Sequence, residues 1–151
     1  MRRQGAVKGR GRRLVEKIKQ RTTEMKTIVI EWLHLEVGGA TCRRCGDTGL
    51  ELARAIEQLQ AECAPRGVEI VARETPLPPG QIAKSNTILI NGVPLEEVLP
   101  DAEASTSCCS SCGDLTGRQE QCRTLVHLGQ AYETIPRDLI RQAVCRIGGC
   151  C

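Results

Sequence analysis

Two cysteines separated by two arginines are the first candidates for chemistry in this chain. The segment Cys42-Arg43-Arg44-Cys45 follows an apolar run and opens a stretch with helical spacing. At a helix start the two thiols lie on one face, close enough to form a disulfide. Free backbone N–H groups and the two guanidinium groups favour a thiolate on Cys42. We therefore expect a redox-active pair in which Cys42 attacks and Cys45 resolves; metal ligation and an inert pair remain alternatives.

A second group of cysteines is crowded into a polar, Ser- and Gly-rich segment. It contains Cys108, Cys109, Cys112 and Cys122, and Cys109-Ser-Ser-Cys112 is a second CxxC motif. Three thiolates and a fourth donor satisfy tetrahedral zinc, and a flexible loop can wrap such an ion. Zinc or another soft metal is thus the expected cofactor here. A disulfide or thiol relay and a reduced, unliganded set stay open.

The chain ends in two adjacent cysteines on a Gly-Gly tether, Cys150 and Cys151. Such a pair can capture a soft metal ion or pass electrons, and we include both residues among the candidate metal ligands. The alternative is a tail without function. His34, eight residues before Cys42, is either a base or ligand near the first pair or a packed or solvent-facing histidine.

The elements that position these cysteines follow from the apolar pattern. Residues 27–35 are apolar and β-branched, as in a buried strand, and 41–64 repeat at helical spacing until Pro65 and Gly67. Residues 68–73 read as a second strand. The strand at 27–35, the helix at 41–64 and this second strand together predict two parallel strands joined by a helix. We further expect a loop at 75–86, a strand at 87–90, a turn at Asn91-Gly92, a helical turn at 94–99, a loop at 101–121, a strand at 123–135 and a helix at 137–147.

The CxxC motif at a strand-to-helix junction resembles the thioredoxin-like superfamily. The stretches IEWLHL, TCRRC, SNTILINGVPLEE, CGD, CRTL and YETIP resemble more closely an uncharacterised family of small thioredoxin-like proteins. This resemblance implies a nucleophilic Cys42 and a resolving Cys45. It also implies an α/β, three-layer fold with a central four-stranded mixed sheet and a Cys-rich insertion between the last two strands. The chain departs from thioredoxins in two ways. It has no WCGPC sequence, and Ser85-Asn86-Thr87 stands where thioredoxins and glutaredoxins place a cis-proline beside the active disulfide.

In such a fold, Cys42 and Cys45 stand at one end of the sheet. The helix at 41–64 ends with Cys63 at the opposite end of the sheet. The insertion emerges at that same end, and the last helix brings its cysteines there too. The topology therefore predicts two sulfur sites, with eight cysteines gathered opposite Cys42 and Cys45. An insertion that folds back onto the first pair is the alternative. The expected domains are a basic, disordered extension at 1–26, a domain at 27–147 with its insertion at 101–122, and a flexible tail at 148–151.

Composition and charge limit the function classes. The chain has 40% apolar and 26% charged residues, one Trp, one Tyr and no Phe, which is typical of a soluble globular domain with an aliphatic core. Residues 1–26 carry ten basic and two acidic side chains, a net charge of +8. This arm lacks aromatics for base stacking, so a solvated tail, or a true start at Met25, is favoured over nucleic-acid binding. No apolar run is long enough for a membrane span, and we expect a cytoplasmic protein without a membrane partner.

These observations predict a thiol-disulfide oxidoreductase that exchanges with a protein thiol or disulfide and needs no cofactor for that exchange. The alternative, from a different class, is a non-enzymatic binder or carrier of a soft metal: zinc, copper, mercury or an iron-sulfur cluster.

Overall fold

The computed structural model describes residues 25–151, so the prediction of a disordered basic extension falls almost entirely outside the described residues. Its centre is a four-stranded mixed sheet in the order β2-β1-β3-β4. The strands are β1 (Lys26–Leu35), β2 (Val68–Leu77), β3 (Thr87–Ile90) and β4 (Val93–Pro94). β1 pairs parallel with β2 and antiparallel with β3, which confirms the expected strand-helix-strand unit and the four-stranded mixed sheet.

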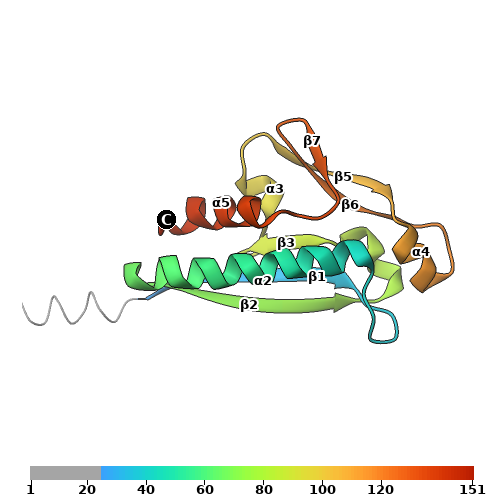
Figure 1. The fold of residues 1–151 in the computed structure, drawn as a ribbon, viewed down its shortest axis with the longest axis horizontal. Helices are drawn as coiled ribbons and strands as arrows, with labels where there is room; N and C mark the ends of the chain where they lie inside the picture. Colours follow the sequence, from blue (N-terminus) through green and yellow to red (C-terminus); the bar gives the residue numbers. More distant parts are fainter. Residues whose placement is uncertain (1–24) are drawn as a thin grey trace, which may run out of the picture.

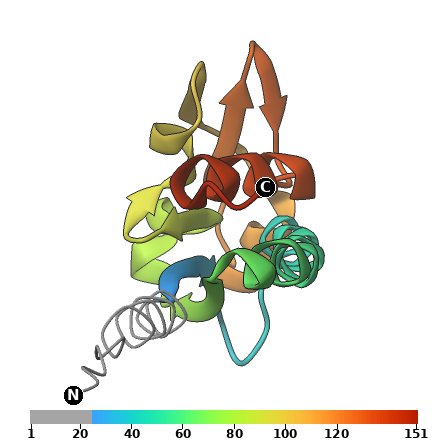
Figure 2. The ribbon, with the colours of Figure 1, turned by 90° about the vertical axis from the view of Figure 1, so that its left-hand side faces the viewer.

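Two long helices cover one face of this sheet (Figures 1 and 2). They are α2 (Arg43–Cys63) and α5 (Arg137–Gly148), and their apolar sides share one core with Ile28 and Ile30 of β1. Alternate residues of a strand point to the same face, so both helices lie on the side of Ile28, Ile30 and Trp32. The other face carries half-buried side chains such as Val29, and the helix layer expected there is not found among residues 25–151.

The segment after β4 forms a second sheet, and this corrects two predictions. β5 (Ala102–Cys108), β6 (Gln121–His127) and β7 (Gln130–Tyr132) make an antiparallel sheet in the order β5-β6-β7. The strand expected at 123–135 is therefore a hairpin outside the central sheet, turned at Leu128-Gly129, where both φ angles are positive. The expected loop at 101–121 contains β5 and the helix α4 (Ser110–Thr116).

Short elements connect these parts. Asn91-Gly92 turns β3 into β4 with positive φ at both residues, as expected for a type I′ turn. α3 (Leu95–Val98) follows β4, and two 3-10 helices, η1 (Ala64–Arg66) and η2 (Pro79–Lys84), flank β2. The loop predicted at 75–86 is shorter than expected, because β2 continues to Leu77. Within residues 25–151, no helix combines the length and the apolar character that crossing a membrane requires.

Candidate metal centre

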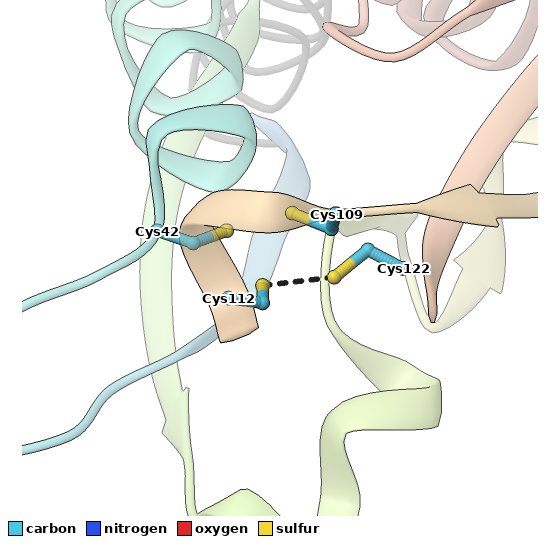
Figure 3. A group of neighbouring side chains, drawn as sticks. All are labelled: Cys42, Cys109, Cys112 and Cys122. Carbon is cyan, nitrogen blue, oxygen red and sulfur yellow. Dashed lines mark hydrogen bonds between the residues drawn. The ribbon is translucent and has the colours of Figure 1, made fainter. Parts of the chain in front are cut away.

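Four buried thiols from three parts of the chain meet at the start of α2 (Figure 3). The sulfurs of Cys42, Cys109, Cys112 and Cys122 all lie within 4.8 Å of one another. Their residues are 1%, 4%, 0% and 0% exposed, and Leu35 and Leu115 pack around them. The Sγ atoms of Cys112 and Cys122 are 2.8 Å apart, joined by a hydrogen bond. This arrangement has the donor type and the number of ligands of a tetrahedral thiolate site.

Each sulfur is placed by the start of a helix or by a strand. Cys42 is the N-cap of α2, and its Sγ accepts a hydrogen bond from the backbone N–H of Cys45. Cys109 is the N-cap of α4, Cys112 lies in the first turn of that helix, and Cys122 is on β6. The backbone N–H of Arg43 donates to Ser111 Oγ at 3.1 Å and so ties the start of α2 to α4.

Glycine is required at one position of α4. A Cβ on Gly113 would lie 2.7 Å from the backbone oxygen of Arg118. The chain after α4 can therefore return close to the helix, toward β6 and Cys122. The close contact between Gly113 and Arg118 thus lies within the segment that joins Cys112 to Cys122.

Arg44 holds the cysteine-bearing segments together. Its guanidinium group is buried and donates to the backbone oxygens of Cys108 at 2.9 Å, Cys122 at 3.1 Å and Ser107 at 3.4 Å. It also lies 3.0 Å from the carboxylate of Glu133. This one side chain thus fixes β5 and β6 against α2, and its positive charge, paired with the Glu133 carboxylate, lies next to the backbone of Cys108 and Cys122.

The cluster concentrates negative charge on one sulfur. Hydrogen bonds from the thiols of Cys122 and Cys45 hold the pKa of Cys42 far below its ordinary value of 9.0. The same hydrogen bonds, together with burial, raise the pKa values of Cys45 and Cys122. Burial raises the pKa of Cys112. In the reduced, metal-free protein one thiolate is therefore surrounded by protonated thiols.

Cys45 and Cys108 flank the cluster without belonging to the four. Cys45 is fully buried one turn into α2, beside Cys42. Cys108, which the sequence placed among the metal ligands, is exposed. A cavity of about 460 Å³ opens next to it, lined in part by Arg43, Asp47 and Cys109. A polar cavity thus reaches Cys109, one of the four clustered cysteines, from the Cys108 side.

The remaining four cysteines lie at the other end of α2. Disulfides join Cys63 to Cys150 and Cys145 to Cys151. Two sulfur sites exist, as expected, but their membership differs from the prediction that eight cysteines gather opposite Cys42 and Cys45. The Cys-rich segment folds back onto the start of α2, so Cys109, Cys112 and Cys122 join Cys42, whereas Cys150 and Cys151 do not.

His34 and Arg44 both have structural roles in the folded chain. His34 is packed: its ring stacks on Trp32, and its Nε2 lies 2.7 Å from the Glu74 carboxylate. The structural role of Arg44 was missed, because a residue between two cysteines is expected to act on them by charge alone. The signal that could have indicated it is an arginine in the first turn of a helix together with the uncharged stretch 104–113, which carries three of the cysteines.

Comparisons with known proteins identify relatives but no activity. Residues 28–144 match the family described as a domain of unknown function (DUF2703). An uncharacterized protein of Archaeoglobus fulgidus is 38% identical over 117 residues, covering 75% of this chain and 82% of the relative. No solved structure matches this chain. The matched region contains both CxxC motifs and Cys122 and stops one residue before Cys145.

Proposed function

The chain belongs to the DUF2703 family, a domain of unknown function, and we propose from its site that it binds a soft metal ion without catalysing a reaction. Zinc fits the donors best, held by Cys42, Cys109, Cys112 and Cys122. The observation that carries the proposal is the approach of four buried sulfurs to within 4.8 Å of one another. Four sulfurs bound at about 2.3 Å to one zinc ion are about 3.8 Å apart. Small side-chain rotations would therefore close the site.

The surroundings favour a metal-thiolate centre over four free thiols. Zinc with four thiolates has a net charge of about −2, which is costly to bury without positive partners. The Arg44 guanidinium and the N-terminal end of α2 supply positive charge at this place. Because all four ligands come from the protein, the centre holds its metal rather than activating a water molecule.

Access from solvent favours a carrier over a purely structural site. Cys108 is exposed and precedes the ligand Cys109 in the chain, and the cavity beside them is lined by polar side chains. An incoming soft metal ion can meet Cys108 first and transfer to the buried sulfurs by ligand exchange. This gives the segment around Cys108 a role in loading, although Cys108 is not a ligand in the final site.

A second candidate function is thiol-disulfide exchange in a thioredoxin-like fold. It is favoured by the lowered pKa of Cys42 and by Cys45 one turn away, with Cys42 as nucleophile and Cys45 as resolving residue. The partner would be a protein thiol or disulfide. Cys42 and Cys45 are only 1% and 0% exposed, so a protein substrate would need the segment around α4 to open. The metal proposal is preferred because it requires no opening of that size.

Zinc titration of the reduced, full-length protein under anaerobic conditions tests the proposal. We expect about one zinc ion bound per chain by these four sulfurs, with loss of that site in Cys112→Ser. The matched control is Cys145→Ser/Cys151→Ser, which changes two cysteines at the other end of α2 and should bind zinc like the wild type. Equal zinc binding by Cys112→Ser and the wild type would exclude the proposed ligand set.

The variant Cys45→Ser separates the two candidate functions. It leaves all four proposed ligands in place, so zinc binding should persist. If the protein exchanges disulfides through Cys42 and Cys45, insulin reduction by the metal-free protein should be lost in Cys45→Ser and in Cys42→Ser. Under the metal proposal, Cys42→Ser loses zinc and Cys45→Ser does not.

A further inference from the structure

The four cysteines at the far end of α2 differ in their exposure to solvent; they are Cys63, Cys145, Cys150 and Cys151. The disulfide between Cys63 and Cys150 is buried, with both residues at most 1% exposed. The disulfide between Cys145 and Cys151 lies at the surface, where Cys145 is half-buried and Cys151 is exposed. The sulfur of Cys151 is within 4.8 Å of the sulfurs of both Cys63 and Cys150. An exposed disulfide thus stands next to a buried one.

This group is separate from the metal centre. Cys42 caps the start of α2 and Cys63 is its last residue, 21 residues further on. At 1.5 Å per residue the two lie about 30 Å apart, too far for a sulfur to pass between them. Any chemistry at Cys63 is therefore independent of the metal proposal.

We propose that Cys145 and Cys151 relay electrons between thiols in solution and the buried disulfide of Cys63 and Cys150. Thiol-disulfide exchange requires a thiolate to reach a disulfide sulfur directly. Solvent thiols can reach the surface disulfide of Cys145 and Cys151 but not the buried pair. Cys151, once released as a thiolate, is already beside both buried sulfurs. The substrate class is a small thiol, which is oxidised to its disulfide.

Backbone geometry and close packing hold residues 149–151 against the end of α2. Gly149 ends α5 in the left-handed conformation, with φ +61°, which turns the last two residues back toward α2. A Cβ on Gly148 would lie 2.7 Å from Ile28 Cδ1 and 3.0 Å from Cys150 Sγ. The close packing at Gly148 holds Cys150 inside, while Cys151, the last residue of the chain, stays at the surface.

The exchange balances in four steps. A first small thiolate attacks Cys145, forms a mixed disulfide and releases Cys151 as a thiolate. Cys151 then attacks Cys63, forms a disulfide with it and releases Cys150, which takes up a proton. A second small thiolate displaces Cys145 from its mixed disulfide and leaves as the small-molecule disulfide. Cys145 then attacks Cys151, restores the surface disulfide and releases Cys63, which takes up the second proton.

The net result oxidises two small thiols and reduces the Cys63–Cys150 disulfide. That disulfide connects the end of α2 to the end of the chain across 87 residues of sequence. Its reduction would release the end of the chain from α2. The relay therefore couples the thiol state of the solution to the attachment of the C-terminal residues.

The variant Cys151→Ser tests the role of Cys151, and Cys145→Ser is its matched control. Both variants abolish the surface disulfide, but only Cys145→Ser keeps the Cys151 sulfur next to the buried pair. Oxidised full-length proteins are incubated with glutathione, quenched by alkylation and mapped by mass spectrometry. Trypsin releases Cys63 in residues 55–66, a peptide with one cysteine, so the readout does not depend on whether the metal centre exists.

We expect the rate of Cys63 reduction in Cys151→Ser to be lower than in the wild type by a factor of about ten or more. In Cys145→Ser the rate should be close to that of the wild type. Equal rates in the wild type and both variants would show direct attack on the buried pair and overturn the relay. Equal slowing in both variants would also overturn it, because the effect would then belong to the surface disulfide and not to the Cys151 sulfur.

A third variant traps the intermediate. In Cys150→Ser the buried partner is removed, so the Cys63 thiol faces the surface disulfide alone. We expect exchange to a Cys63–Cys151 disulfide, seen as residues 55–66 linked to 147–151 with a free Cys145 in 142–146. An intact Cys145–Cys151 disulfide with free Cys63 would show that Cys151 cannot reach Cys63.

Discussion

Cys42 carries the charge of the reduced thiol cluster, because the neighbouring thiols donate hydrogen bonds to it. Its pKa is lowered from 9.0, whereas the pKa values of Cys45, Cys112 and Cys122 are raised above it. The ionised Cys42 stabilises the fold in full above pH 9.0, and this contribution is lost as the pH falls toward the folded-state pKa. The three protonated thiols stabilise the fold below pH 9.0 and cease to do so as the pH rises further.

Thiolate absorbance against pH measures this distribution in the reduced, metal-free protein. We expect the wild type to retain one more thiolate than Cys42→Ser well below pH 9.0. If the two titration curves coincide below pH 9.0, Cys42 is protonated there and the account of the cluster's charge is wrong.

Arg44 and Arg43 form a matched pair for testing the support of the site. Arg44 is buried and donates to three backbone oxygens, whereas the side chain of Arg43 is 87% exposed. Arg44→Met should lower the free energy of unfolding by about 3 kcal/mol and weaken zinc binding, since buried carbonyl groups lose charged donors. Arg43→Met should change stability by less than about 0.5 kcal/mol. Chemical denaturation measures both, and equal effects would contradict the role given to Arg44.

The packing of α2 on β1 depends on a glycine at the point of contact with Trp32. A Cβ on Gly49 would lie 2.6 Å from Trp32 Cη2, whereas a Cβ on Gly46, one turn earlier, would meet only Thr41 Cγ2 at 3.6 Å. Gly46→Ala should therefore stabilise the protein by up to about 1 kcal/mol through helix propensity. Gly49→Ala should destabilise it by about 1–3 kcal/mol through overpacking. Thermal unfolding of both variants checks the difference in sign.

The local sequence pattern was sufficient to predict most elements of the central sheet and the two helices that cover it. The strands at β1 and β3, the helices α2 and α5 and the turn at Asn91-Gly92 agree with the apolar periodicity and the turn residues. β5 and α4 were missed because their residues are mostly small and polar: five of the seven residues of β5 are exposed, so no alternating pattern marks it. A strand without a buried face gives no hydrophobic signal.

The composition of the site could be predicted only in part, because long-range contacts determine it. Both CxxC motifs and Cys122 were recognisable, and three thiolates with a fourth donor were expected. The identity of that donor depends on the path of residues 102–127. This path is fixed by hydrogen bonds such as Arg44 to the Cys122 oxygen and Asn86 to the Arg123 oxygen, across 78 and 37 residues. Local spacing carries no information about such contacts.

The four-sulfur centre connects the two sheets of the molecule. Cys42 belongs to the helix that covers the central sheet, and Cys122 belongs to the second sheet. A metal bound only by the folded protein stabilises it by about 4 kcal/mol when free metal exceeds the dissociation constant a thousandfold. Zinc should therefore raise the thermal midpoint of the wild type and leave that of Cys112→Ser unchanged. A similar rise in both proteins would place the bound zinc elsewhere.

X-ray absorption at the zinc edge of the loaded, full-length protein tests the central claim most directly. The account predicts four sulfur neighbours at about 2.3 Å from the metal, and a reduced sulfur count or no bound zinc in Cys112→Ser. Nitrogen or oxygen neighbours in the wild type, or four sulfurs retained in Cys112→Ser, would show that Cys42, Cys109, Cys112 and Cys122 do not form the metal site.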